Sequence, residues 1–325
     1  MFTLMRHNAA RLEGNKMGIE ASSVSGTSSA VANCGSSIGP SLVSSLPSAP
    51  SPVPSLRVPT VLLFDSGLGG LSVLRELARQ RPDARYVYAA DDAGFPYGAL
   101  DEATLIARVV AVMDALVARL APDVVVISCN TASTLVLPAL RARFSIPFIG
   151  TVPAIKPACE GSQTRLISVL ATPGTVKRDY TKALIRDFAG SCRVTLVGSA
   201  RLAPLVEASF AGEMVGDADF AEEIAPAFVR EGGVRTDTVV LACTHYPLVR
   251  ERLERVAPWR VRWLDPAPAI ARRAVSLVGP ALEERMPLPL RLFSTGAPLD
   301  AALVGRIAGM PARNGELVPM SAELT

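Results

Sequence analysis

Apolar and polar residues alternate along the chain in blocks, and each block has the length of a strand or a helix. Continuous apolar runs of strand length occur at 58–65 (VPTVLLFD) and 123–130 (DVVVISCN), and segments with helical spacing follow at 71–80 and 134–144. Strands that alternate with helices form mostly parallel sheets, whose strands are apolar throughout because helices cover both faces. The pattern therefore predicts an α/β fold.

The same reading predicts the other elements from residue 58 onward. Further strands are expected at 85–91, 146–152, 165–172, 193–199 and 237–245. Further helices are expected at 104–120, 176–188 and 248–256, with a helical region that runs to residue 230.

Two of these series resemble each other, which indicates an internal duplication. VLLFDSGLGG (61–70) corresponds to ISVLATPGTV (167–176), and DVVVISCNT (123–131) corresponds to DTVVLACTH (237–245). Their polar residues follow the carboxyl ends of strands, where open α/β sheets bind ligands near helix N-termini. We therefore expect two pseudo-symmetric three-layer α/β domains with mostly parallel sheets, an active site in the cleft between them, and Cys129 and Cys243 on its opposite walls.

The first 57 residues differ in kind from the rest of the chain. They are rich in Ser, Pro and Ala, with few aromatic or charged side chains. Such a segment buries too little apolar surface to offset the entropy of ordering, so it is expected to be disordered. A transit peptide and a misassigned translation start are the alternatives.

Composition excludes several classes of protein. A net charge of +3 on 325 residues gives no basis for binding nucleic acid or a membrane surface. No apolar run is long enough to span a bilayer, and the N-terminus lacks the apolar core of a signal peptide. The five cysteines are sparse and form no CxxC pair, which favours free thiols in a reducing compartment. We expect a cytoplasmic protein.

Candidate chemistry begins with the matched cysteines. A lone cysteine after an apolar strand is usually a small buried hydrophobe, but Cys129 and Cys243 recur as a pair, each followed by polar donors. His245 follows Cys243 by two residues and is a candidate proton partner. Apart from His245 the sequence contains only His7, so a metal site is not expected. The other cysteines, Cys34, Cys159 and Cys192, lie outside the repeated motif and are read as structural.

Three further motifs carry polar residues with competing interpretations. Asp65, in FDSGLGG, is a candidate hydrogen-bond partner for an ammonium group or a base, or alternatively a helix cap. The loop FPYGAL (95–100) is either part of a site or simple turn chemistry. Spacing alone places Glu207 on a solvated helix face.

Read in order, FDSGLGGLSVL, DDAGFPYG, SCNTAS, ATPGT, LAPLVE and LACTHYPLV closely resemble the glutamate racemases, a family of cofactor-independent amino-acid racemases. The resemblance covers about residues 60 to 270. It implies that two thiols flank the substrate's Cα, one removing a proton while the other donates one. By resemblance, Cys243 takes the proton from L-glutamate and Cys129 takes it from D-glutamate, and no pyridoxal phosphate or other cofactor is implied.

The resemblance also assigns supporting residues. Asp65 is expected beside Cys129, and His245, with Glu207 nearby, beside Cys243. The residues implied in binding the substrate are Asp65, Ser66, Tyr97, Gly98, Asn130, Thr131, Thr172, Thr244 and His245. The family role of D-glutamate is in peptidoglycan synthesis, and its partner is a small-molecule substrate, with a homodimer left open.

The domains implied are 58–152 plus 265–325 for the first and 153–264 for the second. Three other functions remain open. A racemase of aspartate or another acidic amino acid would differ only in pocket shape. A two-domain amino-acid binding protein would not need two opposed thiols, and a thiol hydrolase using Cys243 and His245 would leave Cys129 unexplained.

Overall fold

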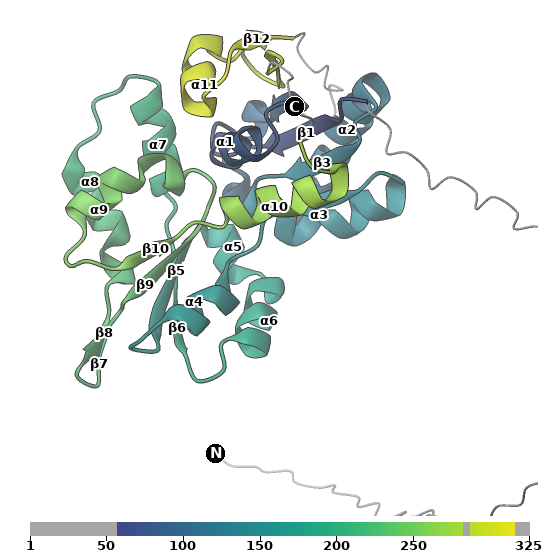
Figure 1. The fold of residues 1–325 in the computed structure, drawn as a ribbon. Coiled ribbons are helices and arrows are strands. Elements are labelled where there is room, and N and C mark those ends of the chain that lie inside the picture. The colour runs from purple at the N-terminus through teal and green to yellow at the C-terminus, as the bar shows by residue number, and fades with distance from the viewer. Residues whose placement is uncertain (1–56, 282–286, 316–325) are drawn as a thin grey trace, which may run out of the picture. The chain divides into compact units, whose positions relative to one another are not determined.

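The computed structural model describes residues 57–281 and 287–315 (Figure 1). All structural statements below concern these residues. The extension predicted to be disordered, 1–57, lies outside them apart from Arg57.

A six-stranded, fully parallel sheet forms the core of what we call the first lobe. Its strand order is β12-β11-β2-β1-β3-β4. The strands are β1 (Thr60–Asp65), β2 (Arg85–Ala90), β3 (Val124–Ile127), β4 (Phe148–Gly150), β11 (Leu290–Ser294) and β12 (Ala312–Asn314). The C-terminal part of the chain thus returns to complete the sheet that the N-terminal strands begin.

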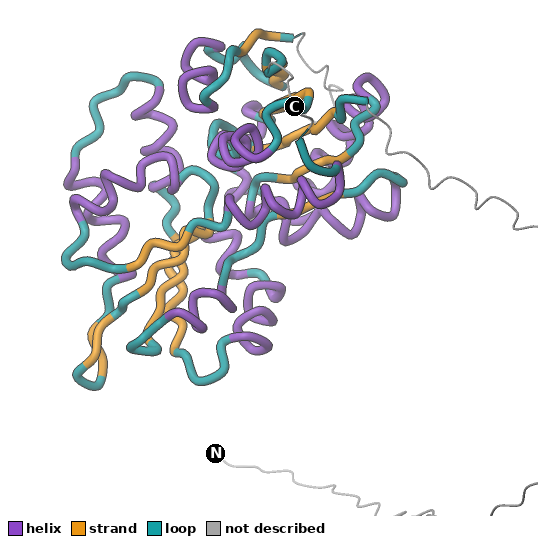
Figure 2. The backbone as a smooth tube through the Cα atoms, in the orientation of Figure 1, coloured by secondary structure: helices purple, strands orange, loops and turns teal. Residues whose placement is uncertain are grey.

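A four-stranded parallel sheet forms the core of the second lobe, in the order β10-β9-β5-β6 (Figure 2). Its strands are β5 (Leu166–Ala171), β6 (Arg193–Gly198), β9 (Thr238–Ala242) and β10 (Arg262–Leu264). A separate antiparallel hairpin consists of β7 (Arg230–Glu231) and β8 (Val234–Arg235).

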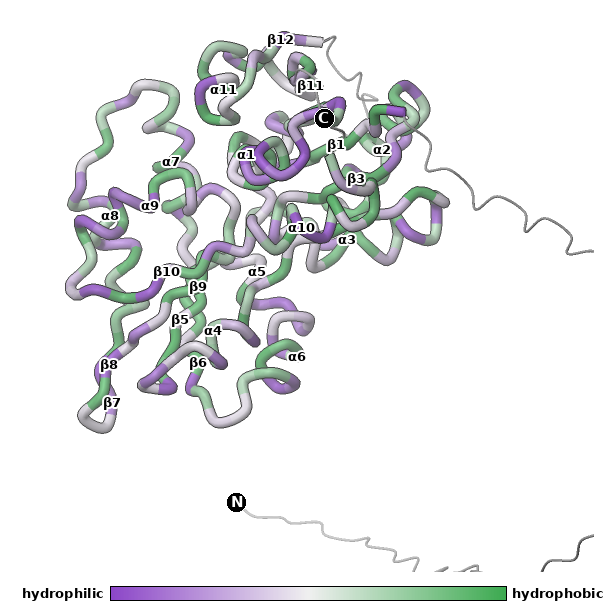
Figure 3. The backbone as a smooth tube through the Cα atoms, in the orientation of Figure 1, coloured by the Kyte–Doolittle hydropathy of each residue, from purple (hydrophilic) through white to green (hydrophobic). Residues whose placement is uncertain are grey.

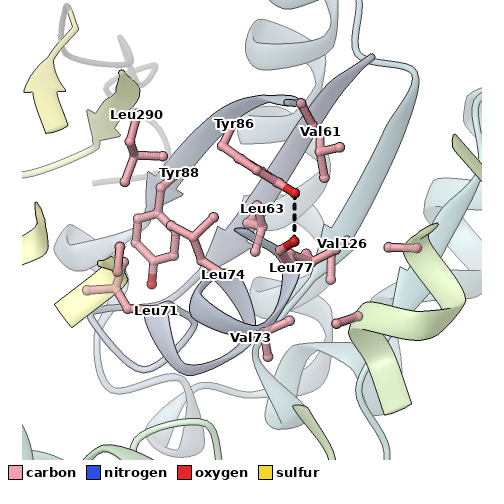
Figure 4. Packing of buried hydrophobic residues seen from close by; sticks show 14 of the residues in the cluster. Val61, Leu63, Leu71, Val73, Leu74, Leu77, Tyr86, Tyr88, Val126 and Leu290 are labelled. Carbon is pink, nitrogen blue, oxygen red and sulfur yellow. Dashed lines mark hydrogen bonds between the residues drawn. The ribbon is translucent and has the colours of Figure 1, made fainter. Parts of the chain in front are cut away.

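Helices cover both faces of the first sheet, which gives it three layers. Val61 and Leu63 of β1 pack on one face, and the intervening Leu62 and Phe64 pack on the other. The first face is covered by α1 (Leu71–Gln80), α10 (Ala267–Val278) and α11 (Ala301–Ala308), and the second by α2 (Glu102–Leu120) and α3 (Asn130–Arg143). Figure 4 shows the first of these cores, in which the Tyr86 hydroxyl donates to the Leu77 carbonyl at 3.0 Å.

The second sheet is layered in the same way. Val239, Leu241 and Cys243 face one cluster, and Val240 and Ala242 face the other. The first cluster includes α7 (Leu202–Phe210), α8 (Asp217–Ile224) and α9 (Arg250–Val256), and the second includes α4 (Ile155–Gly161), α5 (Pro173–Lys177) and α6 (Asp179–Phe188). Short 3-10 helices are η1 (Asp92–Gly94), η2 (Tyr97–Ala99), η3 (Ala225–Ala227) and η4 (Tyr246–Val249). In Figure 3 strands β5 and β9 are hydrophobic, whereas α9 is largely hydrophilic.

The two lobes repeat one topology. The order β2-β1-β3-β4 in the first sheet corresponds to β6-β5-β9-β10 in the second, and every neighbour in both series is parallel. The strands that the sequence repeat aligned, β1 with β5 and β3 with β9, occupy equivalent positions. The predicted α/β class with mostly parallel sheets is confirmed, while the domain boundaries at 152/153 and 264/265 remain a prediction.

Two predictions of local structure were incomplete, and several elements were not predicted. The helical region expected to run to residue 230 ends in η3 and is followed by β7, because Gly232 and Gly233, both with positive φ, form the turn of the hairpin. The helix expected at 176–188 is interrupted, since Arg178 is extended between α5 and α6. Helices α4, α10 and α11 and strands β10, β11 and β12 were not predicted.

Truncating one core leucine measures what the packing of the first lobe contributes. Leu74 of α1 is fully buried in the cluster shared with α10. We expect Leu74→Ala to lower the free energy of unfolding by about 2–5 kcal/mol, because the removed methyl groups leave a cavity. Urea denaturation followed by circular dichroism measures the change. Leu277→Ala on α10, where the side chain is 40% exposed, is the matched control and should stay within about 0.5 kcal/mol of wild type. Equal losses in both variants would contradict the packing described.

Candidate active site

Cys129 and Cys243 line one small cavity, although they come from different sheets. The cavity has a volume of about 30 Å³, which is room for at least one water molecule. Its lining residues are Ser66, Phe95, Pro96, Tyr97, Gly98, Cys129, Asn130, Thr131, Thr172, Ala203, Cys243, Thr244 and His245. The structure thus gathers at one place most of the residues that the sequence motifs singled out.

Strand ends position both thiols. Cys129 follows β3 by two residues and is the N-cap of α3, while Cys243 comes directly after β9 and precedes η4. Both side chains are buried, each with 6% of its surface exposed. A thiol at a helix N-cap lies near the positive end of the helix dipole, which favours negative charge there.

Behind Cys243 lies a relay of two ionisable groups. The Cys243 Sγ is 3.7 Å from Nδ1 of His245, and Nε2 of that ring is 2.6 Å from Oε1 of Glu207. Burial disfavours the charged imidazole, but the hydrogen bonds and charges of Cys243 and Glu207 outweigh it, so the pKa of His245 lies well above its ordinary value. Desolvation likewise opposes ionisation of Glu207, yet its contacts with His245 and the Leu68 amide lower the pKa of that carboxyl. At neutral pH the pair is therefore imidazolium and carboxylate.

The surroundings of Cys129 are different. Its Sγ lies 3.7 Å from the Ser66 hydroxyl, and burial together with the charge of Asp65 raises the pKa of the Cys129 thiol to about 12. Asp65 is fully buried, and desolvation raises the pKa of its carboxyl to about 6 despite hydrogen bonds from the Gly67 amide and the Thr244 hydroxyl. Asp65 acts on Cys129 through its charge, and its direct partners are Gly67 and Thr244.

Hydrogen bonds across the cavity join the two lobes. The Thr244 hydroxyl donates to Asp65 at 3.0 Å, and the hydroxyls of Thr131 and Thr172 are 2.8 Å apart. Glu207 of the second lobe also accepts from the Leu68 amide of the first at 2.6 Å. The contacts that hold the cavity closed therefore run through the residues beside the thiols.

The glycine-rich turn FDSGLGG owes its composition to this contact. A Cβ on Gly69 would lie 2.5 Å from Nδ1 of His245 and 2.6 Å from the Thr244 hydroxyl, far inside van der Waals distance. Glycine is the residue that permits such close backbone approach. The turn therefore serves as a surface on which His245 and Thr244 pack.

Asn130 carries an unsatisfied amide. Its side chain is 2% exposed, and neither its Nδ2 nor its Oδ1 has a hydrogen-bond partner among the described residues. Buried polar atoms usually have partners, and an orphaned amide beside two thiols is suited to bind a polar ligand. Thr131, the next residue, lines the same wall.

Sequence reasoning missed some of the lining and misjudged one side chain. Phe95 and Pro96 belong to the quoted FPYG motif but were not singled out, and Ala203 lies one turn of α7 before Glu207. Glu207 was expected on a solvated face from spacing, yet its partners are Leu68 and His245. Residues so distant in sequence leave no local signal of their contact. Asp65 and Glu207 lie behind the residues that line the cavity.

Neither a cluster of metal ligands nor a membrane-spanning helix is found among the described residues. In 57–281 and 287–315 no three or more His, Cys, Asp or Glu side chains are grouped so as to hold a metal ion. None of the helices in these ranges combines the length and the apolarity needed to cross a membrane.

Comparison with known proteins places this arrangement in a family. The family described as Asp/Glu/hydantoin racemase matches residues 65–274, a range that includes both cysteine motifs. The chain belongs to the Asp/Glu/hydantoin racemase family. Members of this family in other organisms match far beyond the cysteine motifs.

Two relatives and one solved structure illustrate the similarity. Glutamate racemase of Brucella anthropi is 57% identical over 221 residues, 68% of this chain and 80% of the relative. Glutamate racemase of Brucella ovis is 56% identical over 219 residues, 67% of this chain and 79% of the relative. The crystal structure of Escherichia coli glutamate racemase with L-glutamate and the activator UDP-MurNAc-Ala is 40% identical and superposes with a TM-score of 0.72, covering 81% of this chain and all of that one.

The raised pKa of Asp65 predicts an unusual dependence of stability on pH. Between about pH 4 and 6 the unfolded carboxyl ionises while the folded one keeps its proton, so the folded state binds more protons and loses stability as pH rises. Asp65→Asn removes the titrating carboxyl. Both hydrogen bonds are kept, because the amide oxygen accepts from the Gly67 amide and the amide nitrogen donates to the Thr244 hydroxyl. The difference in free energy of unfolding between the variant and wild type should grow in favour of the variant by about 3 kcal/mol as the pH is raised from 4 to 7, measured by urea denaturation.

Asp237→Asn is the matched control of opposite sign. Desolvation of Asp237 is outweighed by hydrogen bonds from the Thr164 amide, the Ser162 hydroxyl and the Gln163 amide, so its pKa is lowered. Its contribution to stability is present above its ordinary pKa and lost as pH falls, so Asp237→Asn should be less stable than wild type at pH 7. A loss of stability at pH 7 in Asp65→Asn as well would contradict the account of Asp65.

Proposed function

We propose that this chain is a glutamate racemase that interconverts L- and D-glutamate with two cysteines and without a cofactor. The observation that carries the proposal is that Cys129 and Cys243, from two equivalent strand ends, line one cavity. The relatives from Brucella and Escherichia coli named as glutamate racemases support the choice of substrate.

Inversion at Cα requires a base on one side and an acid on the other. One thiolate takes the α-proton from one face, and the opposite thiol gives a proton to the other face, so the bond to hydrogen is broken and re-formed with inverted geometry. The reverse reaction exchanges the two roles. A pair of thiols on separate lobes meets this requirement, whereas a hydrolase would need only one.

The two thiols have different electrostatic surroundings. A pKa of about 12 leaves Cys129 as a thiol at neutral pH, the form needed for a proton donor. The imidazolium of His245, held by Glu207, is a hydrogen-bond donor to Cys243 once that thiol has lost its proton. This arrangement is poised for Cys243 to take the proton from L-glutamate and for Cys129 to supply the new one.

Polar groups on the cavity wall are suited to an amino acid's ammonium and carboxylate. The Asn130 amide has no partner among the described residues, and the N-terminus of the 14-residue helix α3 lies beside it. The expected substrate contacts are completed by Asp65, Ser66, Tyr97, Gly98, Thr131, Thr172, Thr244 and His245. The hydrogen bonds from Thr244 to Asp65 and between Thr131 and Thr172 cross the cavity, so we infer that the lobes separate to admit an amino acid.

The wider setting follows from the same proposal. We infer a cytoplasmic enzyme that supplies D-glutamate for peptidoglycan, whose partner is the small amino acid, with no role for nucleic acid or a membrane and with a homodimer as an open possibility. The domain limits of 58–152 plus 265–325 and 153–264 are part of this proposal.

Circular dichroism of L- or D-glutamate incubated with the purified protein, with no cofactor added, tests the function. Wild type should abolish the optical signal of either enantiomer. Cys129→Ser and Cys243→Ser should each lower kcat by roughly 10²–10⁴-fold, since a hydroxyl is a far weaker acid than a thiol and ionises far less readily to the anion that would take the α-proton. Loss of signal from aspartate alone would instead support an aspartate racemase.

The other described cysteines provide matched controls. Cys159→Ser and Cys192→Ser alter buried thiols outside the cavity and should keep wild-type kcat when assayed below their unfolding temperatures. Full activity in either Cys129→Ser or Cys243→Ser would refute the two-thiol mechanism. Binding of glutamate without racemisation by wild type would point to the amino-acid binding protein.

A further inference from the structure

A buried ion pair lies beneath the loop that closes one wall of the cavity. Asp91 follows β2 and is fully buried, and Arg108 of α2 is 5% exposed. The guanidinium donates from Nε to Oδ2 of Asp91 and from Nη2 to Oδ1, both at 2.7 Å. Such a two-point pair fixes orientation as well as distance.

The same carboxylate holds the loop and the C-terminal part of the first sheet. The Tyr97 hydroxyl donates to Oδ2 of Asp91 at 2.5 Å, and the Thr295 hydroxyl, which follows β11, donates to Oδ1 at 2.5 Å. Burial and the charge of Asp91 raise the pKa of Tyr97 well above its ordinary value, so the phenol remains a donor. The Tyr97 hydroxyl is therefore engaged by Asp91.

The backbone of the loop is moulded onto this pair. A Cβ on Gly94 would lie 2.4 Å from Nε of Arg108 and 2.9 Å from Oδ2 of Asp91. A side chain at residue 94 would therefore displace either the loop or the ion pair. Glycine at this position lets the chain pass directly over the guanidinium.

The loop 95–98, held in this way, contacts residues beside both Cys129 and Cys243. The Phe95 ring lies against the His245 ring, with centroids 5.6 Å apart. Tyr97 and Gly98 line the cavity together with Cys129, and Gly98 lies against Thr172 of the second lobe. A shift of this loop would therefore disturb the groups beside Cys129 and beside Cys243 at once.

Stability alone is a poor reason to keep such a pair. Burying two charges costs desolvation that their attraction roughly offsets, and apolar replacements of buried pairs are often equally stable. An ion pair that also receives hydrogen bonds from Tyr97 and Thr295 specifies where three segments of the chain meet.

We propose that Asp91 and Arg108 are positioning residues for racemisation. Together they set the position of the Phe95–Gly98 loop against the groups beside Cys129 and beside Cys243. The inference rests on the proposed racemase function. It assigns Tyr97 a role through its hydroxyl that is independent of any contact between that hydroxyl and the substrate.

The test compares racemisation kinetics of Asp91→Asn with those of wild type. Replacing the carboxylate by an amide removes the charge and one acceptor, so the loop loses its fixed position. We expect kcat/KM to fall about 10- to 100-fold, with KM raised for both enantiomers, because small misplacements of positioning groups cost rates of this size.

A second buried pair in the same lobe provides the matched control. Arg81 donates from Nε to Oδ1 of Asp83 at 2.7 Å, and both side chains are at most 3% exposed. This pair adjoins the end of α10, and neither residue lines the cavity. Asp83→Asn should lower the unfolding temperature while leaving kcat and KM at wild-type values.

A double-mutant cycle distinguishes positioning from an independent role of Tyr97. Tyr97→Phe removes only the hydroxyl and should raise KM in the same direction as Asp91→Asn but by less. The double variant should be no worse than Asp91→Asn alone, since the hydroxyl acts through that carboxylate. If Asp91→Asn does not fold, Gly94→Ala, which pushes a methyl group into the ion pair, should show the same rise in KM.

The outcomes separate this inference from the function on which it rests. An inactive wild type would refute the racemase proposal itself. With an active wild type, unchanged kinetics in Asp91→Asn or Gly94→Ala would overturn the inference. So would an equal rise in KM in Asp83→Asn, or additive effects of Asp91→Asn and Tyr97→Phe.

Discussion

The structure depends on the meeting of two sets of strand carboxyl ends across one cavity. In a parallel sheet all carboxyl ends lie at one edge, so a duplicated unit has two such edges, and closure brings them together. The hydrogen bonds from Thr244 to Asp65 and between Thr131 and Thr172 each join the end of a central strand to the segment after a cysteine strand. Fold, closure and the pairing of the thiols therefore follow from one arrangement.

That arrangement costs electrostatic free energy, and the cost is concentrated at the residues around the cavity. Desolvation raises the pKa of Asp65 to about 6 and that of Cys129 to about 12, so burial works against the charged form of both groups. Beside Cys243 the opposite holds, because His245 and Glu207 neutralise each other in an ion pair. Perturbed pKa values of this kind are common at functional sites, where they lower the stability of the folded protein.

The sequence predicted what depends on local pattern. Apolar runs located β1, β3, β5 and β9, and the repeat located Cys129 and Cys243 at their ends. The helical region expected to reach residue 230 contains α7, α8 and η3 but ends at Ala227, because the two glycines of the β7–β8 turn form a hairpin there. Glu207 could be tied to the site only by resemblance, since its partner His245 is 38 residues away. The Asp91–Arg108 pair and the return of β11 to the first sheet are likewise long-range pairings that no local signal marks.

The two lobes share a topology but have diverged in how they support their thiols. Cys243 has a charged relay of His245 and Glu207, and the Glu207 carboxylate also accepts a hydrogen bond from the Leu68 amide of the opposite lobe. Cys129 has a hydroxyl and a buried carboxylate from its own lobe. A symmetric scaffold thus holds an asymmetric pair, which is what a reaction needs when one group must be a base at the moment the other is an acid. In the proposed reaction the contact between Glu207 and Leu68 ties the relay beside Cys243 to the opposite lobe, whereas the groups beside Cys129 come from its own lobe and need no such contact.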